Sequence, residues 1–532
     1  MDKENTDYDV IVIGAGINGV GIARDAAMRG LKVLLVDKGD IGGGTSSLST
    51  RLIHGGLRYL EHGELRLVRE SLREREFLMR TAPHLVRPLP LLVPVYKHAR
   101  RGLWTVRAGM MAYDALSWNK SLPIHRMLSP AQTLQKILTL NPEGLLGAAV
   151  YFDAQVEFAE RLVVENALSA MEHGATIKTY ARVNKLIVQN GKACGIEFTG
   201  GPRGETQPAR ARIIINAAGP WVDHVLGKAS VSSPRLIGGT KGSHIVVAPF
   251  ADAPTTAIYV EAQADGRPFF IIPWNHKYLI GTTDIRFDGD PDQVRIESDE
   301  IDYLLNETNR VLPRANLTRN HILFAYSGVR PLPFTANRDE QNITRRHFIR
   351  PHAQIDNLFS IVGGKLTTYR SLAEQAVDLV FRILGRSSST CLTDREPLPG
   401  ATTSDFDAFC EDFKQRSPLS AASNDRLLRI YGTRSALIAA AVKEEASLAE
   451  VFDQETGALA AEVVFAFEHE FAKTLSNCLL RRTMVGLNST CGLNSVEAAA
   501  AIAEKHLGWS EGRVEREIAE YRNEALRFRR QL

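Results

Sequence analysis

The chain has 532 residues, which is too long for one compact core, so two or three domains are expected. A hydrophobic fraction of 44% and a net charge of +3 are ordinary for a soluble protein and do not indicate nucleic-acid binding. The five cysteines form no C-x-x-C pair and no zinc-ligand spacing, which favours a reducing compartment and predicts no metal site.

The N-terminal segment MDKENTDYDV is polar and partly acidic. It lacks the apolar core of a signal peptide and the arginine-rich character of a transit peptide. No uninterrupted apolar run reaches the roughly 20 residues needed to cross a bilayer. We therefore expect a chain that begins in the cytosol and does not span a membrane, although it could still bind to the surface of one.

A dinucleotide-binding signature follows. Val10–Ile13 and Val33–Val36 are short apolar runs typical of buried strands, and a helical pattern stopped by Gly30 lies between them. A G-x-G-x-x-G motif follows the first strand, with glycines at Gly14, Gly16 and Gly19. These glycines permit a tight turn, close approach of a pyrophosphate, and close helix–strand packing.

Asp37 lies 23 positions after Gly14, near the spacing expected for a carboxylate that binds a ribose hydroxyl. The motif alone does not distinguish NAD from FAD. The next segment, GGGTSSLSTRLIHGG, is rich in glycine and hydroxyl groups, and we interpret Thr45, Ser46 and Ser47 as a second cradle along a tethered flavin. An ordinary flexible loop is the alternative.

Several blocks in this order resemble the FAD-dependent glycerol-3-phosphate dehydrogenases, the aerobic respiratory enzymes of bacteria. The resemblance runs from about Tyr8 to about Arg370 and continues more weakly to the C-terminus. The blocks are GAGINGVGIARDAAMRG, LIHGGLRYLEHGELRLVRESLREREFL, INAAGPWVD, KGSHIVV, IIPWNHKYLIGTTDIRFDGDP, YSGVRPL and VGGKLTTYR.

The resemblance implies an α/β fold of the amino-acid-oxidase type: a discontinuous, Rossmann-like FAD-binding domain, a substrate domain built on an antiparallel sheet, and a C-terminal helical domain. We expect the FAD domain at 1–90, 150–235 and 331–395, the substrate domain with a membrane-facing segment at 91–149 and 236–330, and the helical domain at 396–532. The strand-like runs SHIVVAP, PFFIIPW and KYLIGTTDI fit the substrate sheet. A strand at Leu358–Val362 followed by a helix fits the FAD domain.

The implied activity is oxidation of sn-glycerol 3-phosphate to dihydroxyacetone phosphate by hydride transfer to FAD, with electrons passed to a membrane quinone. One alternative is a glycerol-3-phosphate oxidase that produces hydrogen peroxide. Another is a flavin-binding sensor without turnover. Such a reaction needs cations for a dianionic phosphate and a proton acceptor for the hydroxyl group.

The resemblance assigns catalytic roles to His244 and Arg330. An imidazole accepts a proton near neutral pH, although Arg330 could instead stabilise an alkoxide while water takes the proton. The implied substrate-binding residues are Arg58, Tyr59, Arg330, Arg345 and Lys365. Guanidinium groups suit phosphate because they present paired donors. We place Lys365 at a helix start, where a cation needs an anion nearby.

The remaining cofactor residues implied by the resemblance are His54, Gly55, Gly219, Gly364, Lys365, Leu366 and Thr367. Gly55 and Gly56 are expected to let the backbone pass close to the flavin ring. We interpret Arg51 and His62 as solvated or one step removed from the site.

One block departs from the family pattern: QVEFAERL places Phe158 and Glu160 at unusual positions, which makes the local helix start uncertain.

Residues 77–113 contain no Asp or Glu and six Lys or Arg, although about four acids would be expected at the chain average. Basic residues alternate there with Trp104, Met110, Met111 and Tyr113, a pattern that suits an anionic lipid surface. A buried helix with charges solvated at its ends is the alternative. We expect a cytoplasmic protein bound peripherally to the inner face of the cell membrane, with the C-terminal helices serving in docking or in a homodimer.

Overall fold

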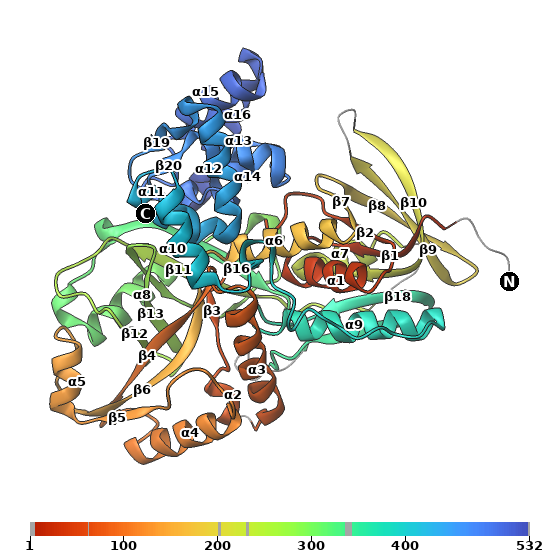
Figure 1. Ribbon diagram of the computed structural model, residues 1–532. Helices are drawn as coiled ribbons and strands as arrows, with labels where there is room; N and C mark the ends of the chain where they lie inside the picture. The colour runs from red at the N-terminus through yellow and green to blue at the C-terminus, as the bar shows by residue number, and fades with distance from the viewer. Residues whose placement is uncertain (1–5, 62, 201–203, 230–233, 336–342, 530–532) are drawn as a thin grey trace.

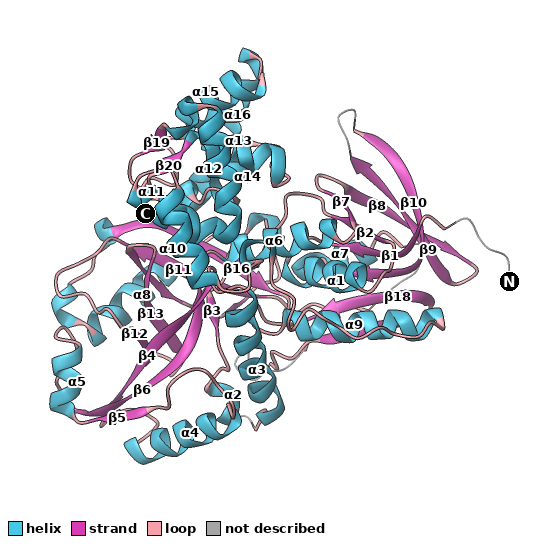
Figure 2. Ribbon diagram, in the orientation of Figure 1, coloured by secondary structure: helices cyan, strands magenta, loops and turns pink. Residues whose placement is uncertain are grey.

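The computed structural model describes residues 6–61, 63–200, 204–229, 234–335 and 343–529. Two β-sheets and a helical region lie side by side: one sheet on the right of Figure 1, the larger sheet below left, and the helices above it. Figure 2 shows that strands dominate the first two regions and that helices dominate the third. The predicted α/β class with a C-terminal helical domain is confirmed.

The first sheet carries the dinucleotide signature. It has eight strands, and its central order β18-β10-β1-β2-β7 is parallel throughout. Alternate residues of β1 point to opposite faces, as the pleat requires: Val10 and Val12 pack against the helices, Ile11 and Ile13 against the β8–β9 hairpin side. The strands are β1 (Tyr8–Ile13), β2 (Val33–Val36), β7 (Thr176–Lys178), β8 (Arg182–Gln189), β9 (Lys192–Gly200), β10 (Glu205–Asn216), β17 (Phe348–His352) and β18 (Ile355–Val362).

Three helices cover one face of this sheet and share one apolar core with it, namely α1 (Ile17–Met28), α6 (Ala159–Glu172) and α9 (Tyr369–Leu384). A short helix, α7 (Val222–Leu226), packs on the other side. The predicted strand at Leu358–Val362 is the second half of β18. The segments of this layer come from three separate parts of the chain, as expected for a discontinuous domain.

The second sheet has ten strands and is antiparallel except where β12 pairs with β4. Its strands are β3 (Leu52–Ile53), β4 (Val86–Tyr96), β5 (Arg126–Leu128), β6 (Leu145–Val156), β11 (Thr240–Val247), β12 (Ala257–Glu261), β13 (Pro268–Trp274), β14 (Lys277–Gly281), β15 (Ile285–Arg286) and β16 (Ile322–Arg330). Its helices are α2 (Arg58–Glu61), α3 (Leu65–Thr81), α4 (Leu103–Leu116), α5 (Pro130–Lys136) and α8 (Ser298–Val311).

The domain boundaries predicted at residues 90 and 150 fall inside β4 and β6, which pair with each other along their whole length. Since a boundary inside a paired strand would divide one sheet, we propose that both strands belong entirely to the second layer. The layer then includes all of residues 86–96 and 145–156, together with β3, which pairs with β6.

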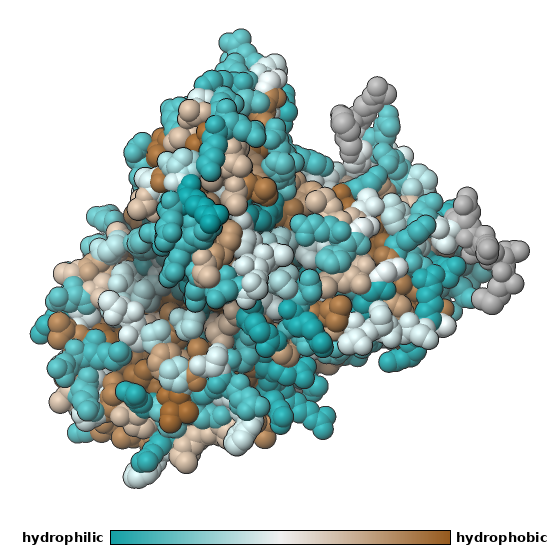
Figure 3. Space-filling view, viewed as in Figure 1, coloured by the Kyte–Doolittle hydropathy of each residue, from teal (hydrophilic) through white to brown (hydrophobic). Residues whose placement is uncertain are grey.

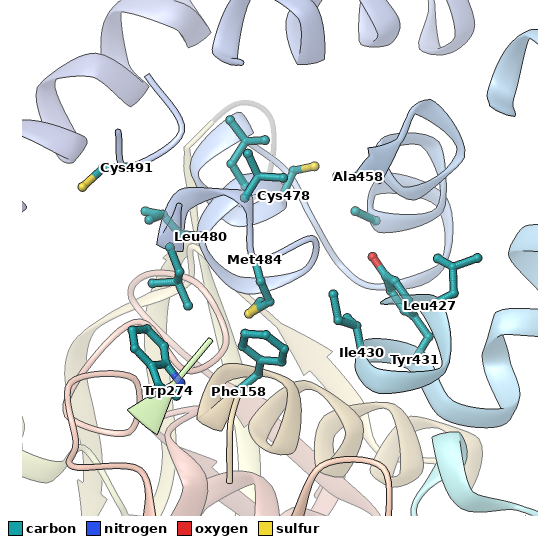
Figure 4. Close-up of a cluster of buried hydrophobic side chains, with 14 of the residues drawn as sticks. Phe158, Trp274, Leu427, Ile430, Tyr431, Ala458, Cys478, Leu480, Met484 and Cys491 are labelled. Atoms are coloured by element: carbon teal, nitrogen blue, oxygen red, sulfur yellow. The ribbon is translucent and has the colours of Figure 1, made fainter. Parts of the chain in front are cut away.

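The helical region packs onto both sheets. It comprises α10 (Phe406–Arg416), α11 (Ala421–Tyr431), α12 (Ser435–Glu444), α13 (Ala460–His469), α14 (Leu475–Arg481), α15 (Val496–Leu507), α16 (Glu511–Ala525) and a hairpin of β19 (Val451–Asp453) with β20 (Ala458–Leu459). Figure 4 shows Met484 against Phe158 and Leu480 beside Trp274. Phe158, which sits unusually in sequence, therefore lies under this domain at the start of α6. Across the described ranges, no helix combines the length and apolarity needed to cross a bilayer.

Candidate active site

A cavity of about 510 Å³ lies at the carboxyl ends of β1 and β2, where ligands of open α/β sheets bind. We call it the glycine cavity. Its lining includes many of the predicted cofactor residues: Gly14, Gly16, Asp37, Thr45, Ser46, Gly219, Gly364, Lys365 and Leu366.

The glycines of the signature are required by close backbone approach. Gly14 has φ of +107°, and a Cβ atom there would lie 2.7 Å from the carbonyl oxygen of Ala217. A Cβ on Gly19 would lie 1.8 Å from the carbonyl oxygen of Gly14, so only glycine lets α1 follow β1 this tightly. Gly19 thus shapes the turn without lining the cavity.

Asp37 lies at the end of β2. Its carboxylate accepts hydrogen bonds from the amides of Ala15 at 2.6 Å and Gly39 at 2.7 Å. Burial raises the pKa of Asp37, while these two amides oppose the shift. A carboxylate so placed has acceptor capacity left for a hydroxyl donor in the cavity.

The hydroxyl-rich loop is only partly a cradle. Ser46 lines the cavity, and its Oγ accepts the Ile17 amide at the start of α1 at 3.0 Å. Thr45 lines it too and donates to the carbonyl oxygen of Val329 at 2.7 Å. Ser47 instead donates to the carbonyl oxygen of Gly42 at 2.6 Å and is not among the lining residues. The Ser47 hydroxyl therefore holds the loop, and its contact with a cofactor stays a prediction.

A second cavity, of about 560 Å³, continues from the first, and we call it the arginine cavity. Both cavities share Thr45, Ser49, Pro331, Gly364, Lys365 and Leu366. All the predicted catalytic and substrate residues line the arginine cavity: Arg58, Tyr59, His244, Arg330, Arg345 and Lys365. The structure thus brings together side chains separated by up to about three hundred residues.

Asp284 joins two of these arginines. Its Oδ1 accepts Arg330 Nη1 at 3.0 Å, and its Oδ2 accepts Arg345 Nη2 at 2.8 Å. Arg330 also donates to Thr282 Oγ1 at 2.9 Å. Burial alone would raise the pKa of Asp284, but the two guanidinium groups hold it below its usual value. Arg345 Nη1 is buried without a hydrogen-bond partner in the protein.

His244 is the fifth residue of β11, which begins three residues before the predicted run SHIVVAP. Its Nε2 lies 2.9 Å from Thr50 Oγ1, its ring stacks on Tyr326 at 4.9 Å, and its Nδ1 is buried without a partner. Burial, followed by Arg330 and Arg51, lowers the pKa of His244 well below 6.5. The imidazole is therefore neutral at pH 7 and able to accept a proton.

Lys365 precedes α9 by four residues, so the predicted position at a helix start is wrong, and the helix dipole does not act on it there. Its Nζ donates to the carbonyl oxygen of His54 at 3.2 Å and to Ser71 Oγ at 3.1 Å. It also lies 4.7 Å from the centre of the Tyr59 ring. Burial lowers the pKa of Lys365 to about 8.

The backbone around His54 is held from two sides. The His54 amide donates to Thr367 Oγ1 at 3.2 Å, and burial lowers the pKa of the His54 ring to about 3. Gly56 lines the arginine cavity with φ of +80°. Gly55 faces the other way: its amide donates to Tyr113 Oη at 2.9 Å, and it is not among the lining residues. Gly55 is needed for packing against Tyr113 of α4, and its contact with a cofactor stays a prediction.

Arg51 is not solvated. Its guanidinium is fully buried and donates to Glu160 at 2.6 and 2.7 Å, which also explains the second unusual residue of the QVEFAERL block. Arg51 lies 4.6 Å from the Trp274 ring as well. His62 lies outside the described residues.

Sequence reasoning missed four residues that shape the site. They are Asp284, Thr50 and two glycines of adjacent strands, Gly242 and Gly281. A Cβ on Gly242 would lie 2.1 Å from Arg330 Nη2, and one on Gly281 would lie 2.4 Å from His244 Cδ2. The sequence offered one sign of Asp284, the acid that ends the GTTD block. The importance of the two glycines becomes visible only when the pairing of the strands is known.

Residues 9–378 match the family described as FAD dependent oxidoreductase, and residues 391–514 match the C-terminal domain of alpha-glycerophosphate oxidase. A glycerol-3-phosphate dehydrogenase of Synechocystis is 48% identical over 97% of this chain and 96% of its own length. The chain belongs to the family of FAD-dependent glycerol-3-phosphate dehydrogenases.

Two more relatives are named for an activity. The aerobic glycerol-3-phosphate dehydrogenase of Escherichia coli is 38% identical over 90% of this chain and 94% of its own. The D-erythritol 1-phosphate dehydrogenase of Brucella abortus is 38% identical over 91% and 95%. The solved structure of the Bacillus halodurans glycerol-3-phosphate dehydrogenase complexed with FAD superposes with a TM-score of 0.81 at 28% identity, covering 99% of this chain and 95% of that one.

The residues present fit FAD. The two cavities are continuous, and the glycine cavity has the size typical of cofactor sites. Two buried polar atoms of its lining residues, Asn18 Oδ1 and Trp221 Nε1, lack a partner in the protein. We propose that Asp37 holds the ribose, Gly14 and Gly16 admit the diphosphate, and Leu366 and Thr367 adjoin the flavin ring.

Proposed function

We propose that this protein oxidises sn-glycerol 3-phosphate to dihydroxyacetone phosphate. The observation that carries the proposal is the charge of the arginine cavity. Its lining residues include two carboxylates, Glu64 and Asp284, and five cations besides Arg51: Arg58, Arg267, Arg330, Arg345 and Lys365. A sixth, Arg51, is already neutralised by Glu160. The excess positive charge matches a phosphate dianion.

The arginines bind and orient the substrate. Burial lowers the pKa of Arg58 and of Arg330, so both cations are held at a desolvation cost that an incoming anion offsets. The unpartnered Arg345 Nη1 supplies a further donor. Asp284 keeps Arg330 and Arg345 close together, so that both can contact one phosphate group.

His244 takes the proton of the C2 hydroxyl group. Burial is the largest cause of the lowered pKa of His244, and a bound dianion opposes only the smaller effect of Arg330 and Arg51, which raises that pKa in the complex. Bound FAD supplies the acceptor for the C2 hydride. His244 and the terminal Arg330 lie on adjacent strands, β11 and β16, and the Arg330 guanidinium packs against Gly242, two residues from His244.

Anaerobic titration of the purified holoenzyme tests the proposal. We expect sn-glycerol 3-phosphate to bleach the oxidised-flavin absorbance and glycerol to leave it unchanged, since glycerol offers no anion to the arginines. Absence of bleaching by the phosphate ester would contradict the proposed function and favour a binding protein. D-Erythritol 1-phosphate belongs in the same experiment because one relative carries that name; faster reduction by it would reassign the substrate.

We propose a membrane quinone as the electron acceptor and an anionic lipid surface as the docking site. Support comes from the exposed apolar side chains of α4 and the residues after it: Trp104 is 79% exposed, Trp118 84% and Ile124 67%. Hydrophobic side chains gather near α4 and β5 at the lower end of the molecule in Figure 3. Such a patch with Arg107 beside Trp104 suits anionic lipid.

A peripheral position on the cytoplasmic face of the membrane follows from this proposal. Quinone reduction measured against peroxide release distinguishes the dehydrogenase from the oxidase alternative. A homodimer through the helical domain stays a prediction, which sedimentation of the purified protein would test.

A further inference from the structure

The glycine cavity has a wall that comes from outside the FAD-binding layer. Within the described ranges, two of its lining residues belong to the helical domain: Arg481, the last residue of α14, and Glu524 of α16. Neither residue belongs to the G-x-G-x-x-G signature. Asp40, Gly43 and Thr45 line the same cavity as Arg481.

Two arginines of the helical domain converge on Asp40 at this wall. Arg482 binds both carboxylate oxygens of Asp40, at 2.8 and 2.9 Å, and Arg481 Nε adds a third hydrogen bond at 2.6 Å. Burial alone would raise the pKa of Asp40, but the two arginines hold it below its usual value. Arg481 also forms a longer ion pair, at 3.7 Å, with the part-exposed Glu524, so it shares the buried Asp40 with Arg482.

Helix α14 and the residues just before it also contact the neighbouring part of the cavity wall, at Thr179 and Tyr180. Asn477 Nδ2 donates to Tyr180 Oη at 2.7 Å, and Lys473 Nζ donates to the carbonyl oxygen of Thr179 at 3.0 Å. Tyr180 lines the cavity, and its amide donates to the carbonyl oxygen of Gly39. The segment before and through α14 therefore contacts both sides of the loop that follows Asp37.

We propose that the C-terminal helical domain is part of the FAD site. Arg481 supplies positive charge toward the diphosphate, the only formally charged part of FAD, and α14 fixes the wall formed by Asp40 and Tyr180. FAD binding and docking of the helical domain then stabilise each other, because a ligand that contacts both parts favours the docked state. This inference rests on FAD as cofactor and is independent of the substrate.

Titration of the flavin-free full-length protein with FAD, followed by flavin fluorescence, tests the proposal. We expect R481M to raise the dissociation constant about tenfold to a hundredfold, the usual effect of losing one charge-assisted contact. R481K keeps the charge and should stay within about threefold of wild type. R522M, which removes an exposed arginine paired with Glu497 in the same domain, is the matched control and should change nothing.

E524Q distinguishes a direct charge contact between Arg481 and FAD from a purely structural role of Arg481. It removes the acid that competes for Arg481, so it should leave FAD affinity unchanged or strengthen it, whereas general loosening of the domain would weaken it. Thermal unfolding of each flavin-free variant shows whether the domain is still docked. Equal FAD affinity in R481M and wild type would overturn the proposal, as would an E524Q loss as large as that of R481M.

Discussion

Gly242→Ala tests the placement of Arg330 without changing any charge. A Cβ on Gly242 would lie 2.1 Å from Arg330 Nη2 and 2.5 Å from its Cζ, whereas real Cβ contacts are essentially never below 3.0 Å. The guanidinium must therefore move by roughly 1 Å, a misplacement that typically costs about a hundredfold at an active site. Its bonds to Asp284 and Thr282, now 3.0 and 2.9 Å, would be lost or lengthened.

We expect kcat/KM for sn-glycerol 3-phosphate to fall about a hundredfold in Gly242→Ala, which corresponds to about 2.7 kcal/mol. FAD should remain bound, because Gly242 does not line the glycine cavity. Steady-state kinetics and the flavin absorbance of the purified variant measure both quantities. Gly512→Ala is the control, since nothing lies within 4 Å of that added Cβ. Unchanged kcat/KM in Gly242→Ala would refute the assigned position of Arg330.

Three further predictions follow from the charges and the surface. Since burial lowers the pKa of Lys365 to about 8, the cation is lost as pH rises through that value, so KM should rise above pH 8 in wild type and stay flat in Lys365→Arg. Glu160→Gln leaves Arg51 buried without its counter-charge and should lower the free energy of unfolding in urea by about 3–5 kcal/mol, against less than about 1 kcal/mol for the exposed-pair control Glu497→Gln. Replacing Trp104 and Trp118 together with Ala should weaken sedimentation with phosphatidylglycerol vesicles about tenfold and leave flavin reduction by substrate unchanged, whereas equal sedimentation would exclude this surface as the lipid contact.

Local patterns predicted the dinucleotide half of the fold well. The buried runs around Gly14 and before Asp37 appear as β1 and β2, because strand, turn and helix there depend on neighbouring residues. The runs SHIVVAP and PFFIIPW likewise appear as β11 and β13. The domain boundaries near residues 90 and 150 were harder to predict from the sequence, since pairing between β4 and β6 joins segments that are distant in the chain.

The site contacts that the sequence did not reveal have the same origin. The Gly55 amide donates to Tyr113, a partner fifty-eight residues away. Arg51 was predicted to be solvated or one step removed from the site, and the first alternative is wrong because Arg51 pairs with Glu160, 109 positions distant. Gly242 and Gly281 carry no local signal in the sequence. Only glycine fits at these positions because the side chains of Arg330 and His244, on neighbouring strands, occupy the space that a Cβ atom would need.

The most direct test of the central claim is anaerobic stopped-flow reduction of the bound flavin by sn-glycerol 3-phosphate carrying deuterium at C2. If the arginines pin the phosphate so that the C2 hydrogen is the one transferred, bleaching should be saturable and several-fold slower with the deuterated ester. Equal rates for the two isotopologues, or no bleaching with either, would contradict that arrangement.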